Sequence, residues 1–369
     1  MNKVRKTIVV SAVNIRKGGT LTILRDCLRY LSSLTEDFRI VALVHRRELC
    51  DYQGIEYIEM PDIIKGWSRR LWCEYVSMYK LSQTLAPVYL WLSMHDTTPY
   101  VKAERQAVYC QTSFPFFHWN LNDLSFDYKI VLFALFTRFA YKINIKRNKY
   151  LIVQAEWLRK GFSKMFGLSE RKFIVAPPRL HGVPNFKRNE GGNDVYTFLY
   201  AATPDCHKNF EIICKASKQL EKELGEGKFK VIFTIAGTEN KYSRWLYKKW
   251  GNITSLKFKG LMEREMLFEY YNQVDCLIFA SRIETWGLPI SEFIPFEKPM
   301  LLADLPYAHE ASMGSKYSAF FDVYDAIQLC QYMKKIIMGD KSFLKGVPMQ
   351  RMANPSVISW KDLFSYLLG

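Results

Sequence analysis

The strongest constraint on the fold of this chain is an alternation of short apolar runs with helical patterns, which occurs twice along its 369 residues. In the first half the apolar runs predict strands at 7–13, 38–44, 87–94, 107–110, 150–154 and 173–177. Helical patterns occupy residues 20–31 and 67–84. This alternation is typical of βαβ units, whose parallel strands form a sheet that helices cover on both faces. The first half therefore predicts an α/β domain with a doubly wound parallel sheet.

Residues 178–195 interrupt this rhythm with two prolines and a polar, glycine-rich stretch, which predicts a linker. The pattern then restarts, with strands predicted at 196–202, 230–237, 255–260, 275–280 and 299–304 and helices at 210–224, 242–250 and 264–272. The predicted organisation is a Rossmann-like domain at 1–180, a linker at 181–195, a second Rossmann-like domain at 196–350 and a C-terminal helix at 351–369 that packs back on the first domain. Sheets of this kind bind ligands at the carboxyl ends of their strands, so we expect a site in a cleft between the two domains.

Positive charge is concentrated in the first half of the chain. The formal net charge is +16, and residues 1–180 hold 28 Lys and Arg against 15 Asp and Glu. A surface of this kind attracts an anionic partner, which could be nucleic acid, anionic lipid headgroups or a phosphorylated substrate. Charge alone does not choose among these three.

Cysteine and apolar content favour a cytosolic protein. The eight cysteines are scattered without a Cys-x-x-Cys pair, so we expect buried, reduced thiols. The apolar stretch at 8–13 is too short for a signal peptide and fits a buried strand better. The most lipophilic stretch elsewhere, residues 130–137, is far shorter than the roughly 20 residues that a membrane-spanning helix needs.

Two turns that follow predicted strands carry features of anion binding. Gly18 and Gly19 lie between the first strand and its helix, where backbone amides can approach an anion closely. An ordinary tight turn explains them equally well, and the lack of a complete G-x-G-x-x-G argues against a dinucleotide fingerprint. In the second domain, Lys208 lies where a helix begins and can place an ammonium beside phosphates, although a solvated surface lysine is the alternative.

The stretch SRIETWGLPISEF, residues 281–293, follows another predicted strand and contains two carboxylates eight positions apart, Glu284 and Glu292. We expect Glu284 in the loop and Glu292 in the first turn of the next helix, with Pro289 near the start of that helix. Carboxylates at such strand ends can accept hydrogen bonds from the vicinal hydroxyls of a sugar or a ribose. The helix macrodipole also favours an acidic residue in a first turn without any binding role, so spacing alone leaves both interpretations open.

Further polar side chains follow strands of the first domain. His95 and Asp96 come together after one strand, and Gln111 and His118 come after the next. A His-Asp pair can orient a substrate or move a proton, whereas histidines near loops often serve only as caps. No catalytic triad is evident in the sequence, and the six histidines assemble no metal-ligating cluster.

Taken together, these segments resemble the retaining glycosyltransferases of family 4, which have the GT-B fold of two Rossmann-like domains facing a central cleft. The resemblance covers nearly the whole chain and rests on the glycine pair and on four further segments: LIVQAEWLRKGFSKMFGLSERKFIVAPP, HKNF, FKGLMEREMLFEYYNQVDCLIFASRIETWGLPISEF and LLADLPYAHEASMG. The glutamate pair matches the family's E-x7-E motif.

The resemblance implies an enzyme, a hexosyltransferase that binds a nucleotide-sugar donor mainly in the second domain and an acceptor mainly in the first. It implies catalytic roles for Glu284 on the donor sugar, for Lys208 on the departing diphosphate and for His95. The other implied donor contacts are Gly18, Gly19, Asn209, Gly237, Trp286, Gly287, Leu288 and Glu292, the last of these on the nucleotide ribose. Acceptor contacts are expected at Asp96, Gln111 and His118. Neither a metal nor a cofactor is implied, and the donor base, whether UDP, GDP or dTDP, stays open.

The sequence departs from the family pattern at three places. The arginine that commonly precedes the phosphate lysine is missing, and the nearest basic residue is His207. Gln111 stands where a histidine often ends a strand of the first domain. In the glutamate motif Trp286 replaces the usual phenylalanine, and Pro295 is expected to end or kink the helix early.

The resemblance also gives the basic first half a purpose. Many bacterial members add sugars to lipid-linked intermediates of O-antigen, capsule, exopolysaccharide or lipopolysaccharide at the inner face of the cytoplasmic membrane. We therefore expect a cytoplasmic, peripheral protein that binds a lipid-linked saccharide and an anionic membrane surface, and no nucleic acid. Residues 125–147 are the first candidate for the membrane contact, and a buried core helix is the alternative for them.

Two other functions remain open at this stage. A sugar-nucleotide epimerase with the GT-B fold would act on the donor without any acceptor. A basic protein that binds a membrane surface without catalysis would need neither Lys208 nor the glutamate pair.

Overall fold

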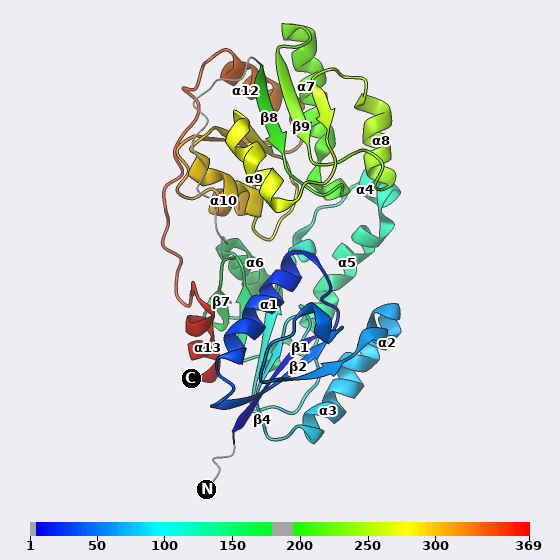
Figure 1. Ribbon diagram of the computed structural model, residues 1–369, viewed down its shortest axis with the longest axis vertical. Coiled ribbons are helices and arrows are strands. Elements are labelled where there is room, and N and C mark those ends of the chain that lie inside the picture. Colours follow the sequence, from blue (N-terminus) through cyan, green and yellow to red (C-terminus); the bar gives the residue numbers. More distant parts are fainter. Residues whose placement is uncertain (1–4, 179–194) are drawn as a thin grey trace. The chain divides into compact units, whose positions relative to one another are not determined.

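The computed structural model describes residues 5–178 and 195–369, and these fall into two compact units (Figure 1). Among the described residues, unit 1 contains 5–115, 135–178 and 352–369, and unit 2 contains 116–134 and 195–351. The linker predicted at 181–195 lies outside the described residues except for Val195.

Unit 1 is built on a sheet of seven strands that are all parallel to their neighbours. Its strands are β1 (Lys6–Ala12), β2 (Phe38–Val44), β3 (Ile55–Glu59), β4 (Val88–Ser93), β5 (Arg105–Cys110), β6 (Tyr150–Val153) and β7 (Phe173–Val175). Their order in the sheet is β3-β2-β1-β4-β5-β6-β7. Consecutive residues of β1, such as Ile8, Val9 and Val10, are completely buried, because helices cover both faces of the sheet.

The helices of unit 1 pack on this sheet through apolar faces. They are α1 (Gly18–Ser32), α2 (Trp67–Trp72), α3 (Met78–Thr84), α6 (Glu156–Phe166) and α13 (Trp360–Leu368). Leu21, Leu24, Leu28 and Leu31 recur every three or four residues along α1 and are all buried, as an amphipathic helix requires. The predicted helix at 67–84 consists of α2 and α3 joined by one π-helical turn, Cys73–Ser77.

Unit 2 contains a second sheet, of six parallel strands, in the order β10-β9-β8-β11-β12-β13. Its strands are β8 (Tyr196–Tyr200), β9 (Phe229–Phe233), β10 (Leu256–Phe258), β11 (Cys276–Phe279), β12 (Met300–Ala303) and β13 (Ser318–Phe321). Its helices are α4 (Leu121–Phe126), α7 (Phe210–Leu224), α8 (Lys241–Trp250), α9 (Arg264–Gln273), α10 (Leu288–Phe293), α11 (Pro306–Ala311) and α12 (Ala326–Ile337). The prediction of two doubly wound parallel sheets is therefore confirmed.

Helix α5 (Tyr128–Lys142) begins in unit 2 and ends in unit 1. Among the helices of the described residues, none combines the length and the apolarity needed to cross a bilayer. Short 3₁₀ turns occupy Arg47–Leu49, Pro61–Lys65, Phe114–Phe116, Ile145–Arg147, Glu170–Lys172, Cys206–Lys208 and Ile294–Phe296. All eight cysteines are buried and none forms a disulfide.

The prediction that residues 116–134 belong to the first domain is wrong, because these residues pack in unit 2. The ring of Phe126 lies 5.2 Å from that of Tyr242 and 4.8 Å from that of Trp245, centroid to centroid. The Lys241 ammonium also donates to the carbonyl of Ser125 at 2.5 Å. These partners lie more than 100 positions away in the sequence, so no local pattern could have identified them.

The C-terminal residues 352–369 are part of unit 1, where α13 lies beside α1 (Figure 1). The segment that leads to α13 pairs with the end of β7, since the amide of Val175 donates to the Pro355 carbonyl at 3.0 Å. The buried Arg159 of α6 donates to the carbonyl of Ala353 at 2.8 Å and pairs with Glu156. One guanidinium therefore attaches the returning segment to unit 1.

Arg159→Met is expected to lower the free energy of unfolding by about 2–4 kcal/mol, because the Ala353 carbonyl loses its donor and the Glu156 carboxylate loses its counterion. Urea unfolding followed by circular dichroism measures the change. Lys160→Met, at the exposed neighbouring position, is the control and should stay within about 0.5 kcal/mol of the wild type. Equal stability of the two variants would contradict the proposed attachment.

Candidate functional site

Each sheet has one point where the strand order reverses, between β1 and β4 in unit 1 and between β8 and β11 in unit 2. In open α/β sheets, ligands bind beyond the carboxyl ends of the strands at such a point. Gly18 and His95 follow the two strands in unit 1, and Lys208 and Glu284 follow the two strands in unit 2. The chemistry-bearing residues predicted from the sequence thus collect at the expected edge of each sheet.

In unit 2, Lys208 and Glu284 form an ion pair between Nζ and Oε1. Their side chains are about equally accessible, at 15% and 16% exposure. The two residues are 76 positions apart in sequence, and the neighbouring strands β8 and β11 bring them together. The site therefore offers an ammonium that can bind phosphate and a carboxylate that can accept from hydroxyls, side by side and partly accessible to solvent.

The turn that carries Lys208 is held firmly by its neighbours. Asn209 adopts a left-handed conformation with φ of 59°, and its buried amide donates to the carbonyls of Val323 at 2.8 Å and Ala280 at 3.3 Å. The hydroxyl of Tyr200 donates to the carbonyl of Lys208. Asn209, expected to contact the donor, thus has its side-chain amide committed to the position of the lysine turn.

A buried ion pair that the sequence analysis did not find lies behind this turn. Arg282 and Asp123, with side chains 4% and 2% exposed, form a bidentate pair that includes an Nη1–Oδ2 distance of 2.9 Å. Arg282 Nη2 also donates to the carbonyl of Cys206 at 3.1 Å, and the Arg282 amide donates to the carbonyl of His207 at 2.8 Å. Asp123 is itself positioned by the capping box at the start of α4, in which Asn120 is the reciprocal partner.

Part of this arrangement leaves a signal in the sequence. The pattern Asn-x-x-Asp at 120–123 is a capping-box pattern that could have been recognised, and Arg282 lies inside the glutamate motif. What the sequence does not reveal is that the two residues pair, because they are 159 positions apart.

His207, the basic residue nearest to the position of the missing family arginine, does not supply a second cation. It is buried, and its ring meets that of Phe117 edge to face at 6.2 Å. Burial, together with the charges of Lys208 and Arg282, lowers the pKa of His207 well below its ordinary value. The imidazole is therefore neutral at pH 7.

Glu292 lies one turn further into its helix than expected. Helix α10 begins at Leu288, so Glu292 is its fifth residue and lies outside the first turn. The favourable helix-start position therefore does not account for this glutamate. Its carboxylate accepts from Arg264 Nη2 at 3.2 Å and from the Tyr271 hydroxyl at 3.5 Å, and burial raises the pKa of Glu292.

The rest of the glutamate motif is shaped by backbone geometry. Gly287 has φ of 93°, and an added Cβ would lie 3.3 Å from side-chain atoms of Ile290 and Tyr307. Trp286 Nε1 donates to the Ser291 hydroxyl at 2.9 Å, which fixes the indole against α10. The α-helix ends at Phe293, immediately before a 3₁₀ turn that contains Pro295, and this confirms the expected early end of the helix.

Leu288 and Gly237 are two further residues that were predicted to contact the donor. The Leu288 side chain, at the start of α10, is exposed. Gly237, with φ of 87°, lies four residues beyond the end of β9, and an added Cβ would lie 2.6 Å from Tyr247 Cβ. A packing requirement therefore accounts for glycine at this position.

In unit 1, His95 is completely enclosed in a polar network. Its Nε2 is 3.2 Å from the Ser11 hydroxyl and 3.3 Å from that of Ser93, and its Nδ1 is 3.0 Å from the Thr97 hydroxyl. The π-helical turn brings the Glu74 carboxylate to 3.5 Å from the same Nδ1. Burial lowers the pKa of His95 to about 4, so the ring is neutral at pH 7 and both nitrogens are engaged within the protein.

Asp96 and Gln111 lie together at the ends of β4 and β5. Asp96 has φ of 70° and accepts from the amides of Gln111 and Thr112, and burial raises the pKa of Asp96 to about 6. The side-chain amide of Gln111 donates through Nε2 to the Met94 carbonyl at 2.7 Å. His118, the third predicted acceptor contact, is exposed and belongs to the segment that packs in unit 2.

Gly18 and Gly19 form the first residues of α1 and are exposed. The N-cap residue, Lys17, forms no side-chain capping bond, so the first amides of α1 are open to an anion. In residues 5–178 and 195–369, no three His, Cys, Asp or Glu side chains are grouped as a metal site would require.

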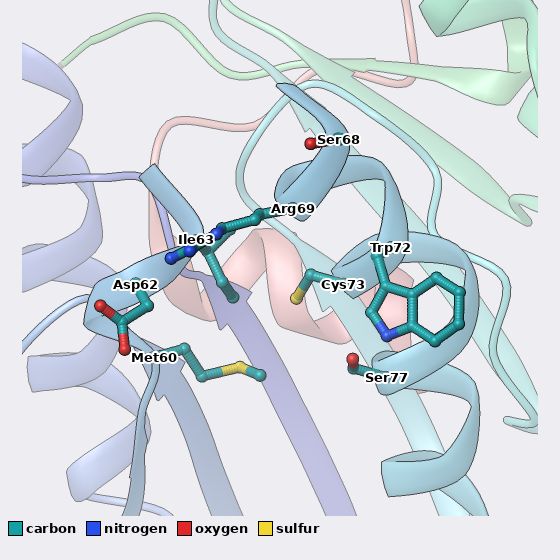
Figure 2. Close-up of a pocket in the computed structure, with 8 residues that line it drawn as sticks. All are labelled: Met60, Asp62, Ile63, Ser68, Arg69, Trp72, Cys73 and Ser77. Atoms are coloured by element: carbon teal, nitrogen blue, oxygen red, sulfur yellow. The ribbon is translucent and has the colours of Figure 1, made fainter. Parts of the chain in front are cut away.

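Unit 1 also contains a hollow of about 430 Å³ between the end of β3 and α2, shown in Figure 2. It is lined by Met60, Asp62, Ile63, Ser68, Arg69, Trp72, Cys73 and Ser77. In Figure 2 the side chains of Met60, Ile63 and Cys73 point toward one another, and Trp72 lies to one side of them. None of the site residues predicted from the sequence is among its lining residues, so we keep this hollow separate from the candidate site.

Comparisons with known proteins identify a matching family and a relative of this chain. Residues 184–343 match the family described as Glycosyl transferases group 1, which covers both Lys208 and the glutamate pair. The chain is 21% identical over 320 residues to the O-antigen chain mannosyltransferase RfbU of Salmonella typhimurium strain LT2, covering 82% of this chain and 84% of that relative.

Solved structures share the fold at low identity. A glycosyltransferase from Rickettsia africae superposes with a TM-score of 0.64 at 14% identity, covering 92% of this chain and 91% of that structure. The Anabaena protein Alr3699/HepE, solved with UDP-glucose, superposes with a TM-score of 0.58 at 12% identity, covering 91% of this chain and 92% of that structure. These likenesses identify the two parallel-sheet units as a GT-B fold.

Asp123→Ala is expected to lower the free energy of unfolding by about 3–5 kcal/mol, because it leaves the Arg282 guanidinium buried without a counterion. Thermal and urea unfolding measure the loss. Asn122→Ala, at the exposed adjacent position, provides the control. A loss below about 1 kcal/mol for Asp123→Ala would show that the pair is not needed for stability.

Asp96→Asn is expected to stabilise the protein at about pH 8 and to have little effect near pH 4. Burial raises the pKa of Asp96 in the folded protein from 3.8 to about 6, so the folded protein binds the proton of this carboxyl more tightly than the unfolded chain does. The free energy of unfolding therefore falls as the pH rises from the lower of these two values through the higher one. Asparagine removes the charge, keeps an acceptor and tolerates positive φ, so we expect a gain of about 1–3 kcal/mol at the higher pH. Urea unfolding at both pH values is the measurement, with the exposed Asp37→Asn as control. An unchanged pH dependence would contradict the expectation.

Proposed function

Because this chain is a group 1 glycosyltransferase with the GT-B fold, we propose that it transfers a hexose from a nucleotide sugar to a lipid-linked saccharide, with retention of anomeric configuration. The observation that carries the donor half of this proposal is the Lys208–Glu284 pair at the switch point of unit 2. A nucleotide sugar presents phosphates and sugar hydroxyls close together, and the pair presents an ammonium and a carboxylate close together.

Lys208 stabilises the departing nucleoside diphosphate in this scheme. Negative charge on the diphosphate increases as the bond to the sugar breaks, and a cation already in position lowers the energy of that transition state. Glu284 is the partner of Lys208 in this structure, so a bound diphosphate replaces one anionic partner of the ammonium by another. The freed carboxylate of Glu284 then accepts hydrogen bonds from the hydroxyls of the donor sugar. Because Lys208 supplies the cation, we propose that transfer needs no metal ion.

Glu292 is assigned to the ribose of the nucleotide. Its carboxylate is held by Arg264 and Tyr271 at the second turn of α10, so it is oriented before any ligand binds. A carboxylate in this state can accept from both vicinal hydroxyls of a ribose. The Anabaena structure contains UDP-glucose and the Salmonella relative is named a mannosyltransferase, so UDP- and GDP-linked hexoses are the first donors to test.

The acceptor is assigned to unit 1, at the ends of β4 and β5. Asp96 and Gln111 lie there together, where the Asp96 carboxylate accepts from the backbone amide of Gln111. Both ring nitrogens of His95 are engaged, so we assign His95 a positioning role for this edge of the sheet. In retaining transfer the acceptor hydroxyl attacks from the face that the diphosphate leaves, and an oxygen of the diphosphate takes its proton.

The pathway proposed is the assembly of bacterial O-antigen or a related surface polysaccharide, on the strength of the relative's name and of the basic first half. Such acceptors are carried on lipid, so the protein is proposed to work on the cytoplasmic face of an anionic membrane, attached peripherally. The positive charge of residues 1–180 suits this location.

Lys208→Met is expected to lower kcat by about 10²–10³-fold, because it removes the cation that stabilises the leaving diphosphate. A thermal-shift screen with UDP, GDP, dTDP and their sugars first identifies the donor, since a bound ligand raises Tm by mass action. Product formation is then measured with that donor and a saccharide acceptor. Lys218→Met, an exposed lysine of α7, is the control.

Two results would overturn the proposal. A fully active Lys208→Met variant would remove the central role of the ammonium. Conversion of the donor to an epimer without any acceptor would show an epimerase in place of a transferase.

A further inference from the structure

Helix α5 has two apolar faces, and residues 5–178 and 195–369 cover only one of them. Val131, Ala134, Thr137 and Tyr141 are buried, with the Tyr141 ring 6.0 Å from that of Phe162 in α6. Exposed large apolar side chains line the other face at Tyr128, Leu132, Leu135, Phe136 and Phe139, and Ile143 continues the line one residue after the helix. A helix that is apolar all round is normally enclosed, so the uncovered face calls for an apolar environment outside the chain.

The exposure is large for aromatic residues. Phe136 is 61% and Phe139 58% exposed. Their spacing of three positions places them on one side of the helix, with Leu132 and Leu135 one turn before them. Single exposed apolar residues are common on protein surfaces, whereas six on one helical face over 16 residues form a continuous stripe.

The same stretch is strongly cationic. Residues 128–149 contain six Lys and Arg and no Asp or Glu. Lys129, Arg138 and Lys142 flank the apolar stripe and are exposed, and the Arg138 guanidinium lies 5.2 Å from the ring of Phe139. Apolar and aromatic side chains flanked by cations are the composition of helices that lie in the interface of an anionic membrane.

We infer that the outer face of α5 is the surface by which this protein binds an anionic lipid bilayer, with Phe136 and Phe139 inserted among the acyl chains and Arg138 and Lys142 beside the headgroup phosphates. The inference rests on the proposed lipid-linked acceptor for its biological purpose. The surface itself is identified by the residues of α5. The helix lies along the bilayer surface, because a helix of 15 residues is too short to cross it.

A second copy of the chain is the other occupant that an apolar face can bind. Two-fold pairing through α5 would bring the cations of this acid-free stretch against those of the second copy, and like charges at an interface repel. Anionic headgroups neutralise the same charges. Charge complementarity therefore favours the bilayer over self-association.

Sedimentation with lipid vesicles tests the inference on the full-length protein. We expect the wild type to bind vesicles of phosphatidylcholine mixed with phosphatidylglycerol and to bind less tightly as salt is added. Phe136→Ser/Phe139→Ser should weaken this binding at least about tenfold, because the inserted aromatic area is lost. Arg138→Gln/Lys142→Gln should weaken it by about tenfold or more on anionic vesicles, with little change on vesicles of phosphatidylcholine alone.

A matched control comes from unit 2. Ile327 and Met338, in and just after α12, are 67% and 70% exposed, so Ile327→Ser/Met338→Ser removes similar apolar area from another surface. This variant should bind vesicles as the wild type does. Wild-type vesicle binding by Phe136→Ser/Phe139→Ser would overturn the inference. A wild-type dimer in light scattering that this variant converts to monomers would also overturn it, in favour of self-association.

The outcome is separable from that of the proposed function. Vesicle binding needs no donor, and the donor-induced rise in Tm should be the same in the wild type and in both α5 variants. A wild type that shows the donor shift but fails to bind anionic vesicles would refute the membrane surface and leave the transferase proposal standing. Vesicle binding without a donor-induced rise in Tm would refute the transferase proposal and leave the membrane surface standing.

Discussion

The candidate donor site depends on the buried ion pair between Arg282 and Asp123. Arg282 lies two positions before Glu284 and donates to the Cys206 carbonyl two positions before Lys208, so one guanidinium connects the two turns that carry the Lys208–Glu284 ion pair. Asp123 comes from a segment of the first half of the chain that packs in unit 2. Because a buried guanidinium is costly without a counterion, the segment has to remain on unit 2 for the lysine turn to keep its position.

The ionisable side chains at the two switch points differ in burial and in charge. In unit 2, Lys208 and Glu284 stay partly accessible and paired, a state in which a ligand with its own phosphates and hydroxyls can exchange for the internal partner. In unit 1, burial makes His95 neutral and raises the pKa of Asp96. The switch point of unit 2 therefore carries a paired ammonium and carboxylate that are partly accessible, whereas that of unit 1 carries a buried, neutral imidazole.

Helix α5 shows why an apolar segment is hard to interpret before the structure is known. A buried core helix and a surface contact were alternative interpretations of residues 125–147, and each describes one face of the helix. Val131 and Tyr141 are enclosed by the protein, whereas Phe136 and Phe139 lie outside it. Composition reports how apolar a segment is, but the fraction of that apolar surface which the rest of the chain covers depends on residues far away in the sequence.

The sequence by itself determined the parallel-sheet class, the position of most strands and the turns that carry Lys208, Glu284 and His95, because these depend on local periodicity and on where strands end. It also determined the early end of α10, because Pro295 acts on its own helix. Short strands such as β3 and β13 were missed, since a few residues of mixed polarity give too weak a period. Only the tertiary structure decided the pairing of Arg282 with Asp123, the enclosure of His95 beside Glu74 and the assignment of residues 116–134 to unit 2. Each of these depends on contacts between residues distant along the chain, and the energy of such contacts comes from burial and charge pairing that no local pattern records.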